Sequence, residues 1–286
     1  MSPLANRTIA TVGSGVMAEA MIAGLLRGNL VAPQQVVASH PRAERRAALE
    51  GTHGIRVVAS NTDAVAGADV VILAVKPQML AKVGREIGPH LKDGQLVLSV
   101  LAGPTTHALT GTLGHAQVVR AMPNTPARIG NGMTVWYATP ATTEDQRAQA
   151  KALLSALGAE LEVEDEKWVA MATAISGTGP AYVFLVMEAL IDAAVHLGFP
   201  RHIAHDIVIE TLEGSTRFAK QSGDHPAVLR NMVTSPAGTS AAAIHELESG
   251  RLRTVLSEAV WAAFRRTVEL GDQMDAQLTG DPAPKR

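Results

Sequence analysis

The sequence has no cysteine and almost no excess charge, and both shortages narrow the classes of protein it can belong to. Without cysteine the chain forms no disulfides, has no thiolate nucleophile and offers no thiolate to a metal. A net charge of −2 gives no reason to expect nucleic acid or a membrane surface as a partner. The N-terminus lacks the pattern of a signal peptide, and no uninterrupted apolar run approaches the length of a membrane span. We expect a soluble, cytoplasmic protein.

Histidine supplies no metal site either. The ten histidines show no paired metal-ligand spacing, and His202 and His205, three apart on one expected helix, are too few for a site. Apolar residues make up 47% of the 286 residues, which is enough for two domains with hydrophobic cores. We therefore expect a globular, metal-free protein of two domains.

The first half of the chain alternates short apolar runs with segments of helical character. Runs rich in valine, isoleucine and leucine are typical of strands buried on both faces of a parallel sheet. Strands are expected at 8–12, 36–39, 55–59, 70–75, 96–100, 118–120, 133–138 and 159–163, and helices at 16–27, 42–50 and 144–157. This alternation predicts a doubly wound α/β domain over residues 1–165.

Residues 166–286 carry no strand pattern, and we expect an all-helical second domain there. Helices are expected at 167–175, 180–197, 201–221, 225–233, 240–248 and 251–270, separated by glycine and proline. Within 181–197 the clearly polar residues are Glu188, Asp192 and His196, which lie four apart and form one narrow stripe. Because the rest of this helix is apolar, we expect a partner subunit to complete the core of a small helical domain.

The segment Gly13-Ser14-Gly15-Val16-Met17-Ala18 follows the first strand and opens the first helix. It has the G-x-G-x-x-A form of the dinucleotide-binding fingerprint. In that fingerprint Gly13 makes a tight turn, Gly15 lets the backbone approach a pyrophosphate, and Ala18 keeps the helix close to the strand. A structural turn is the alternative, but the α/β repeat around the segment favours a bound dinucleotide.

The residues after the second strand bear on which dinucleotide is bound. Enzymes that use NAD commonly place an acidic residue here, whereas this chain has Ser39-His40-Pro41-Arg42, with Arg45 and Arg46 one turn later. A hydroxyl and a guanidinium suit the 2′-phosphate of NADP. We expect NADPH to be preferred, with NADH as the weaker alternative. A capped helix with a solvated basic face would explain the same residues without a ligand.

Three further segments lie where a ligand is expected. Residues 74–77 (AVKP) and 120–126 (RAMPNTP) end two strands at the edge of the sheet where open α/β folds bind ligands. Residues 176–180 (SGTGP) open an apolar helix and would present an anion-binding helix N-terminus. The alternatives are a surface charge for Lys76, a rigid connector for 120–126 and a domain hinge for 176–180.

Residues 233–240 (VTSPAGTS) predict a turn that leads directly into a helix. Pro236 fixes one backbone angle, Gly238 adopts conformations closed to other residues, and Thr239 and Ser240 are natural helix caps. The unpaired N–H groups and the positive end of the helix dipole suit a small anion. From these residues alone, an ordinary capped helix remains the alternative.

The five motifs, taken in order, resemble the pyrroline-5-carboxylate reductase family over nearly the whole chain. They are GSGVMA at 13–18, AVKP at 74–77, RAMPNTP at 120–126, SGTGPAY at 176–182 and HPAVLRNMVTSPAGTS at 225–240. The resemblance implies an α/β Rossmann-type dinucleotide-binding domain followed by an all-α C-terminal dimerisation domain. It also implies a homodimer or a larger assembly of dimers, and reduction of pyrroline-5-carboxylate to L-proline by NAD(P)H, the last step of proline biosynthesis.

The resemblance implies a role for each matched position. The cofactor would be held by Val12, Gly13, Ser14, Gly15, Val16, Met17, Ser39, Arg42, Asn61, Ala74, Val75, Lys76 and Pro77, and the nicotinamide would lie by Met122, Pro123, Asn124, Ser176 and Gly177. The N–H groups of Gly238, Thr239 and Ser240 would bind the substrate carboxylate, and the Ser240 hydroxyl would be the catalytic group at the ring nitrogen. A protonated imine already accepts hydride, so the main tasks left are positioning and charge complementarity.

The chain departs from the family's usual residues at four positions. Val16 stands where asparagine is usual, Thr178 where serine is, Ala237 where glycine is, and Ser240 where threonine is. Two other classes remain open: a reductase of another cyclic imine or a 3-hydroxy acid, and a non-catalytic NADP(H)-binding module. A hydroxy-acid enzyme would use a lysine of the second domain, and Lys167 and Lys220 lack a supporting motif.

Overall fold

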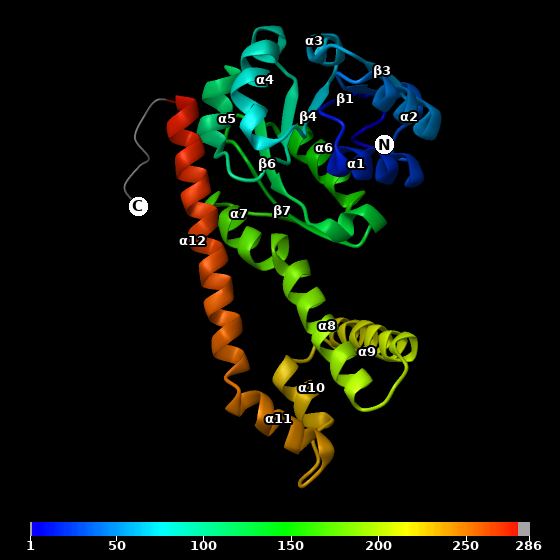
Figure 1. The fold of residues 1–286 in the computed structure, drawn as a ribbon. Helices are drawn as coiled ribbons and strands as arrows, with labels where there is room; N and C mark the ends of the chain where they lie inside the picture. Colours follow the sequence, from blue (N-terminus) through cyan, green and yellow to red (C-terminus); the bar gives the residue numbers. More distant parts are fainter. Residues whose placement is uncertain (1, 280–286) are drawn as a thin grey trace. The chain divides into compact units, whose positions relative to one another are not determined.

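An eight-stranded sheet forms the centre of the first half of the chain in a computed structural model, which describes residues 2–279 (Figure 1). The strands are β1 (Ile9–Val12), β2 (Val36–Ser39), β3 (Arg56–Val58), β4 (Val70–Leu73), β5 (Leu96–Ser99), β6 (Val118–Met122), β7 (Gly132–Ala138) and β8 (Gly158–Glu162). Their order is β3-β2-β1-β4-β5-β6-β7-β8; β1 to β6 are parallel, whereas β7 is antiparallel to β6 and parallel to β8. The doubly wound α/β domain is confirmed.

Helices cover both faces of this sheet. They are α1 (Val16–Arg27), α2 (Ala43–His53), α3 (Asn61–Val65), α4 (Leu80–Ile87), α5 (Thr106–Leu113), α6 (Glu144–Ser155) and α7 (Lys167–Ala172). The helices α3, α4 and α5 were not predicted, and the local signals of α3 and α5 are weak. The first is five residues long, and α5, THALTGTL, is rich in threonine and glycine, which form helices poorly.

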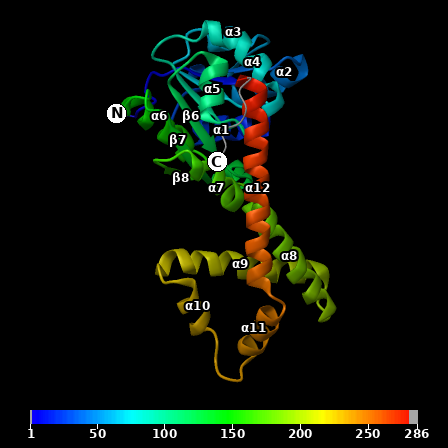
Figure 2. The ribbon, with the colours of Figure 1, turned by 90° about the vertical axis from the view of Figure 1, so that its left-hand side faces the viewer.

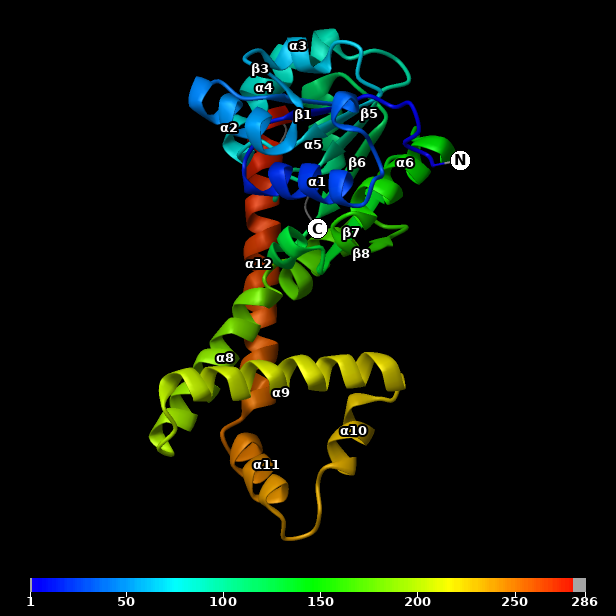
Figure 3. The ribbon, with the colours of Figure 1, turned by 90° about the vertical axis from the view of Figure 1, so that its right-hand side faces the viewer.

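The core has two layers because side chains alternate between the faces of each strand. Ile9 and Ile72 pack in one layer with residues of α1, α2 and α6, and α1 and α6 are both visible in Figure 3. Their neighbours Ala10 and Val71 point the other way and pack with residues of α3, α4 and α5. All four side chains are fully buried, as expected for strands covered on both faces.

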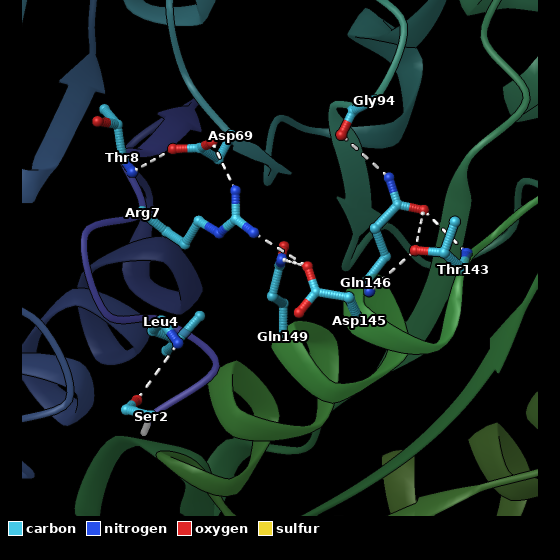
Figure 4. A network of polar contacts seen from close by, with 10 residues as sticks. All are labelled: Ser2, Leu4, Arg7, Thr8, Asp69, Gly94, Thr143, Asp145, Gln146 and Gln149. Carbon is cyan, nitrogen blue, oxygen red and sulfur yellow. Dashed lines mark hydrogen bonds and ion pairs between the residues drawn. The ribbon is translucent and has the colours of Figure 1, made fainter.

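A polar network joins the amino ends of the strands (Figure 4). Arg7 donates to Asp69 Oδ1 at 3.2 Å and to Asp145 Oδ2 at 3.0 Å, and the Thr8 N–H donates to Asp69 Oδ2 at 2.7 Å. Thr8 precedes β1, Asp69 precedes β4, and Asp145 lies in the first turn of α6. The network therefore ties two central strands and a covering helix together, at the end of the sheet opposite the expected ligand edge.

The segment 167–196 is helical except at Thr178. The helix α7 passes into a π-helical turn (Thr173–Gly177), and α8 (Gly179–His196) begins after Thr178, with Pro180 in its first turn. The break predicted at 176–180 is present, but it is a single residue long. The Thr178 N–H, just before α8, donates to Thr173 O at 2.8 Å and is therefore already paired. By length and composition, the helical segment 167–196 could cross a membrane, with a mean hydropathy of 1.5 in an 18-residue window, contrary to the expectation of no such run.

The remaining helices are α9 (Arg201–Ser222), α10 (Pro226–Met232), α11 (Thr239–Ser249) and α12 (Leu252–Thr279). The chain divides into two compact units, one running to Thr178 and resuming at Ala263, the other spanning Gly179–Ala262. This division differs from the expected boundary at 165 because two helical segments beyond that residue belong to the sheet unit. The helix α7 packs on β7 through Val169 and Val135, and Leu278 of α12 packs on the sheet layer of α4 and α5. Residues 280–286 of the expected second domain lie outside the described residues.

The helical unit has almost no buried side chains of its own. Among residues 179–262 only Ala204 and Val208, both on α9, are buried. None of the residues of α8 is buried, and Leu185 is 66% exposed. The helix α8, whose core we expected a partner subunit to complete, is therefore largely uncovered within a single chain, although it packs along α9.

Candidate functional site

A cleft of about 860 Å³ lies at the carboxyl ends of β1, β2 and β4. The strand order reverses between β1 and β4, which is where open α/β sheets bind ligands. Ten of the predicted cofactor residues line this cleft, namely Gly13, Ser14, Gly15, Val16, Ser39, Arg42, Asn61, Ala74, Val75 and Lys76. The fold thus brings together predicted residues as far apart in the sequence as Gly13 and Lys76.

The two glycines of the fingerprint are needed for different reasons. Gly13 has φ +86°, and a Cβ on it would lie 2.8 Å from Val75 Cγ1, so the turn itself requires glycine. Gly15 has an ordinary extended conformation, and a Cβ there would meet no atom of residues 2–279 within 4 Å. Within the described part of the chain no contact therefore demands glycine at 15, and the open space beside it fits the approach of a pyrophosphate.

The N-terminus of α1 opens at this cleft without a side-chain cap. Gly15 is its N-cap residue, and the nearby Ser14 hydroxyl donates instead to Ser39 O at 2.9 Å. The first N–H groups of a helix have no partner within the helix, so here they are left for a ligand. Together with the positive end of the helix dipole they suit a phosphate.

Ser39 does not present its hydroxyl to the cleft as expected. The residue is fully buried, and its hydroxyl lies 2.7 Å from Asn61 Oδ1 and 3.3 Å from Thr11 O. Asn61 in turn donates from Nδ2 to Glu86 Oε2 at 3.0 Å. The carboxylate can only accept, so it fixes the Asn61 amide with the oxygen toward Ser39. Ser39 therefore supports Asn61, and Asn61 and Glu86 form this wall of the cleft.

The three arginines after β2 also have different roles. Arg45 donates to Glu19 Oε2 at 2.6 Å and to Ser14 O at 3.2 Å. The hydrogen bond from Arg45 lowers the pKa of the Glu19 carboxyl. Arg46 donates to the carbonyl oxygens of His40 and Pro41 at 3.0 and 2.8 Å. Arg42 is exposed on the cleft, with no side-chain partner among the described residues. Of the three guanidinium groups, Arg42 is the one free to bind a phosphate.

His40 lines the same end of the cleft with a fixed ring orientation. Its Nδ1 accepts from the Arg42 N–H at 3.2 Å, so in the neutral ring Nε2 carries the proton. Burial, and then the positive charge of Arg42, Arg45 and Arg46, lowers the pKa of His40. A phosphate bound beside Arg42 would offset that positive charge.

Other predicted cofactor residues lie elsewhere, and some cleft residues were missed. Val12, Met17, Pro77, Met122, Pro123, Asn124, Ser176 and Gly177 are not among the described residues that line the cleft. Lining residues that the sequence analysis did not identify are Glu19, Ala59, Met79, Lys82, Val83 and Glu86. Lys82 and Glu86 are one turn apart on α4, so recognising that helix after residues 74–77 would have placed both on one face.

The segment after β6 packs against the π-helical turn. Asn124 donates from Nδ2 to Ser176 O at 3.0 Å and accepts at Oδ1 from the Met133 N–H at 2.9 Å. A Cβ on Gly177 would lie 3.2 Å from Met122 Cε. The two segments predicted to flank the nicotinamide are thus in contact, beyond the carboxyl end of β6.

The turn before α11 is strained and its helix is uncapped. Ala237 has φ +59°, in the left-handed region that disfavours a side chain. Gly238 is the N-cap residue without a side-chain cap, and a Cβ on it would overlap the Ser235 hydroxyl. Its N–H donates to Ser235 O at 3.1 Å. Of the three N–H groups predicted to bind a carboxylate, that of Gly238 already has a partner. Those of Thr239 and Ser240 lie in the first turn of α11, where N–H groups have no partner within the helix.

The cleft and the fold together define a class of protein, the Rossmann-type NAD(P)H-dependent oxidoreductases. Residues 8–103 match the family model described as NADP oxidoreductase, coenzyme F420-dependent, and residues 166–270 match pyrroline-5-carboxylate reductase dimerisation. The chain is 43% identical to a pyrroline-5-carboxylate reductase of Pseudomonas aeruginosa over 93% of its own length and 97% of the relative's. The chain belongs to the pyrroline-5-carboxylate reductase family.

Solved structures agree with this assignment. A pyrroline-5-carboxylate reductase from Coxiella burnetii superposes with a TM-score of 0.87 at 35% identity, covering 92% of this chain and 98% of that one. A Plasmodium falciparum pyrroline carboxylate reductase with NADP bound gives a TM-score of 0.84 at 28% identity, with 93% and 98% covered. The predicted fold class, a Rossmann-type domain followed by a helical dimerisation domain, is confirmed.

Proposed function

We propose that this protein reduces pyrroline-5-carboxylate to L-proline with hydride from NAD(P)H, the last step of proline biosynthesis. The observation that carries the proposal is the uncapped N-terminus of α1 beside the open face of Gly15, in a chain of this family. A bound nicotinamide supplies the hydride, which adds to the imine carbon while the C=N π electrons become the lone pair of the ring nitrogen. The protonated imine thus becomes a neutral secondary amine, and no metal is needed.

The cofactor would lie along the cleft, with NADPH preferred over NADH. In this proposal the N–H groups of Val16 and Met17 bind the pyrophosphate, and Arg42 binds the 2′-phosphate. Support comes from the absence of an acidic residue at the end of β2 and from the unpaired Arg42. Lys76 and Lys82 add positive charge along the same cleft. Met122, Pro123, Asn124, Ser176 and Gly177 would border the nicotinamide.

The substrate would be held at the start of α11. The N–H groups of Thr239 and Ser240 would bind its carboxylate, aided by the helix dipole, and the Gly238 N–H would join them only by leaving Ser235 O. The Ser240 hydroxyl would hydrogen-bond the ring nitrogen and orient the imine carbon toward the hydride donor. Support comes from the missing side-chain cap at Gly238, which leaves this helix end open.

The assembly would be a homodimer or a larger set of dimers in the cytoplasm, with no nucleic-acid or membrane partner. Support comes from the match of residues 166–270 to a dimerisation model and from the exposed apolar faces of the same residues. In this proposal a second subunit, rather than lipid, covers the apolar helix at 167–196.

NADPH oxidation tests the proposed function. The purified protein is assayed with pyrroline-5-carboxylate, with a six-membered cyclic imine and with 3-hydroxy acids plus NADP, and proline formation is measured directly. We expect oxidation with the five-membered imine at the highest kcat/KM. A higher kcat/KM for another imine or a hydroxy acid would favour that substrate class. NADPH binding without turnover on any substrate would favour a non-catalytic NADP(H)-binding module.

A further inference from the structure

The end of α12 is bonded to the start of α5. The Thr105 hydroxyl donates to Asp275 Oδ2 at 2.6 Å, and the Thr105 N–H donates to Asp275 Oδ1 at 3.2 Å. Thr105 is the N-cap residue of α5, and its hydroxyl oxygen also accepts from the Ala108 N–H at 3.2 Å. Asp275 is buried, with 8% of its surface exposed. Figure 2 shows the end of α12 beside α5.

A second carboxylate binds the next residue of the same helix. Glu166, just before α7, accepts from the Thr106 N–H at 2.7 Å and from the Thr106 hydroxyl at 2.6 Å. Its Oε1 also accepts from Arg120 of β6 at 2.7 Å. Two carboxylates at a helix N-terminus are favourable because they face its positive end and its open N–H groups.

These contacts hold the loop between β5 and α5, residues 100–105. Gly103 has φ +110°, and a Cβ on it would lie 3.2 Å from Met274 Sδ, so the end of α12 packs directly on this glycine. Arg120 of β6 also contacts the loop, with one guanidinium nitrogen 3.5 Å from Gly103 O. The loop is therefore fixed between α12 and β6.

The position of this loop in the sheet connects it with the site. The strand β5 lies between β4 and β6 and is parallel to both, so residues 100–105 leave the same edge as residues 74–77 and 122–124. Those two segments are predicted cofactor residues on either side. Met274 and Asp275 lie beyond residue 270, where the match to the dimerisation family ends.

We propose that Asp275 is a positioning residue, which acts through Thr105 to fix the β5–α5 loop at the cofactor edge for hydride transfer. The proposal rests on the proposed function. Asp275 itself touches neither cofactor nor substrate. Without its carboxylate the N-cap residue loses two hydrogen bonds, and the loop between the two cofactor-binding segments gains freedom. Small displacements of a reacting group lower the rate of hydride transfer steeply.

The test compares three variants of the full chain: Asp275→Ala, Asp275→Asn, which keeps one acceptor oxygen, and Gln277→Ala, an exposed control on the same helix. Two readouts are used, namely hydrogen exchange of residues 99–109 with NADPH present, and the primary isotope effect on kcat with NADPH deuterated at the transferred position. For Asp275→Ala we expect faster exchange, a fall in kcat of about tenfold and a larger isotope effect, because hydride transfer becomes more rate-limiting. Asp275→Asn should be intermediate and Gln277→Ala unchanged.

A purely structural role predicts a different pattern. Loss of folded protein would lower the apparent kcat but leave the isotope effect and the KM values unchanged, and this result would overturn the proposal. Unchanged exchange at 99–109 would overturn it as well. If the unaltered protein bound NADPH but reduced no imine, the proposed function would fail on its own, and the exchange readout would still decide whether Asp275 holds the loop.

Discussion

The two compact units of this chain differ in how far each can stabilise itself. The sheet unit buries both faces of its parallel strands, with fully buried side chains such as Ile9 and Ile72 on one face and Val71 and Leu73 on the other. The helical unit buries only Ala204 and Val208 and leaves large apolar side chains exposed on α8 and α9. Since burial of a large apolar side chain contributes about 1.5–3 kcal/mol, the helical unit lacks the main source of folding free energy.

The difference shows which functions each unit can perform alone. The cofactor cleft is built entirely from residues of the sheet unit and is fixed by that unit's own hydrogen bonds. The uncapped start of α11 lies in the unit that needs a partner to cover it. Cofactor binding should therefore be independent of assembly, whereas substrate binding should depend on it.

The largest effect is expected from a charge on the exposed face of α8. Leu185→Asp should lower the association constant at least about a hundredfold, because the interface loses an apolar side chain worth about 2 kcal/mol and must bury a carboxylate. Sedimentation velocity would show monomers. NADPH affinity should stay within about twofold, since the cleft belongs to the other unit. Ala47→Asp on the exposed surface of α2 is the matched control and should leave assembly intact. Equal loss of NADPH binding would contradict the independence of the two units.

The next effect concerns turnover at the start of α11. Ser240→Ala should lower kcat by about ten- to a hundredfold, through loss of the proposed hydrogen bond to the ring nitrogen, with little change in NADPH affinity. Steady-state kinetics and fluorescence titration would separate the two quantities. Ser240→Thr keeps the hydroxyl and should retain most of the activity. Unchanged turnover in Ser240→Ala would remove this residue from the mechanism.

A third effect should be confined to the sheet unit. Arg42→Ala should weaken NADPH binding by about tenfold while leaving NADH binding nearly unchanged, because only NADPH carries the 2′-phosphate. Arg42→Lys, which keeps the charge but not the paired donors, should be intermediate. Titration with both cofactors provides the measurement. A similar loss for both cofactors, or a preference of the unaltered protein for NADH, would exclude this assignment.

The same substitution should have opposite effects at two positions of the helical unit. Ala237→Gly relieves a left-handed alanine and should raise the free energy of unfolding by about 1 kcal/mol. Ala241→Gly, inside the first turn of α11, should lower it by a similar or smaller amount. Thermal unfolding of the assembled protein measures both. A destabilised Ala237→Gly variant would show that the strain at 237 is offset by contacts of its methyl group.

The smallest effect concerns the pH dependence of the cofactor cleft. The pKa of His40 is lowered in the folded protein, so His40 binds a proton more readily in the unfolded chain. Its contribution to stability therefore falls as the pH drops from the ordinary histidine pKa of 6.5 through the lowered pKa of the folded state. His40→Gln should remove that part of the pH dependence of unfolding. Denaturant titrations between pH 5 and 8 would show it (roughly the window in which histidine titrates). Identical pH profiles would contradict a lowered pKa.

Local patterns were enough to predict most of the sheet unit. All eight strands were predicted to within about two residues, most of them because short runs rich in valine, isoleucine and leucine are strong local signals. The break predicted at 176–180 falls at Thr178, but the π-helical turn at 173–177 just before it was not predicted. Pro180, which has no backbone N–H, lies in the first turn of α8, where proline is tolerated.

The sequence by itself determined the α/β and helical halves, the fingerprint at 13–18 and the family, because these depend on the order and spacing of residues along the chain. Only the tertiary structure decided which groups are free to act. It buries the Ser39 hydroxyl against Asn61, assigns Arg45 to Glu19 and leaves Arg42 open. The physical reason is that hydrogen-bond partners are set by proximity in space, and the partners of these groups lie on other elements. At 233–240 likewise, the predicted turn exists, but in its backbone conformation the Gly238 N–H donates to Ser235 O and the start of α11 has no side-chain cap.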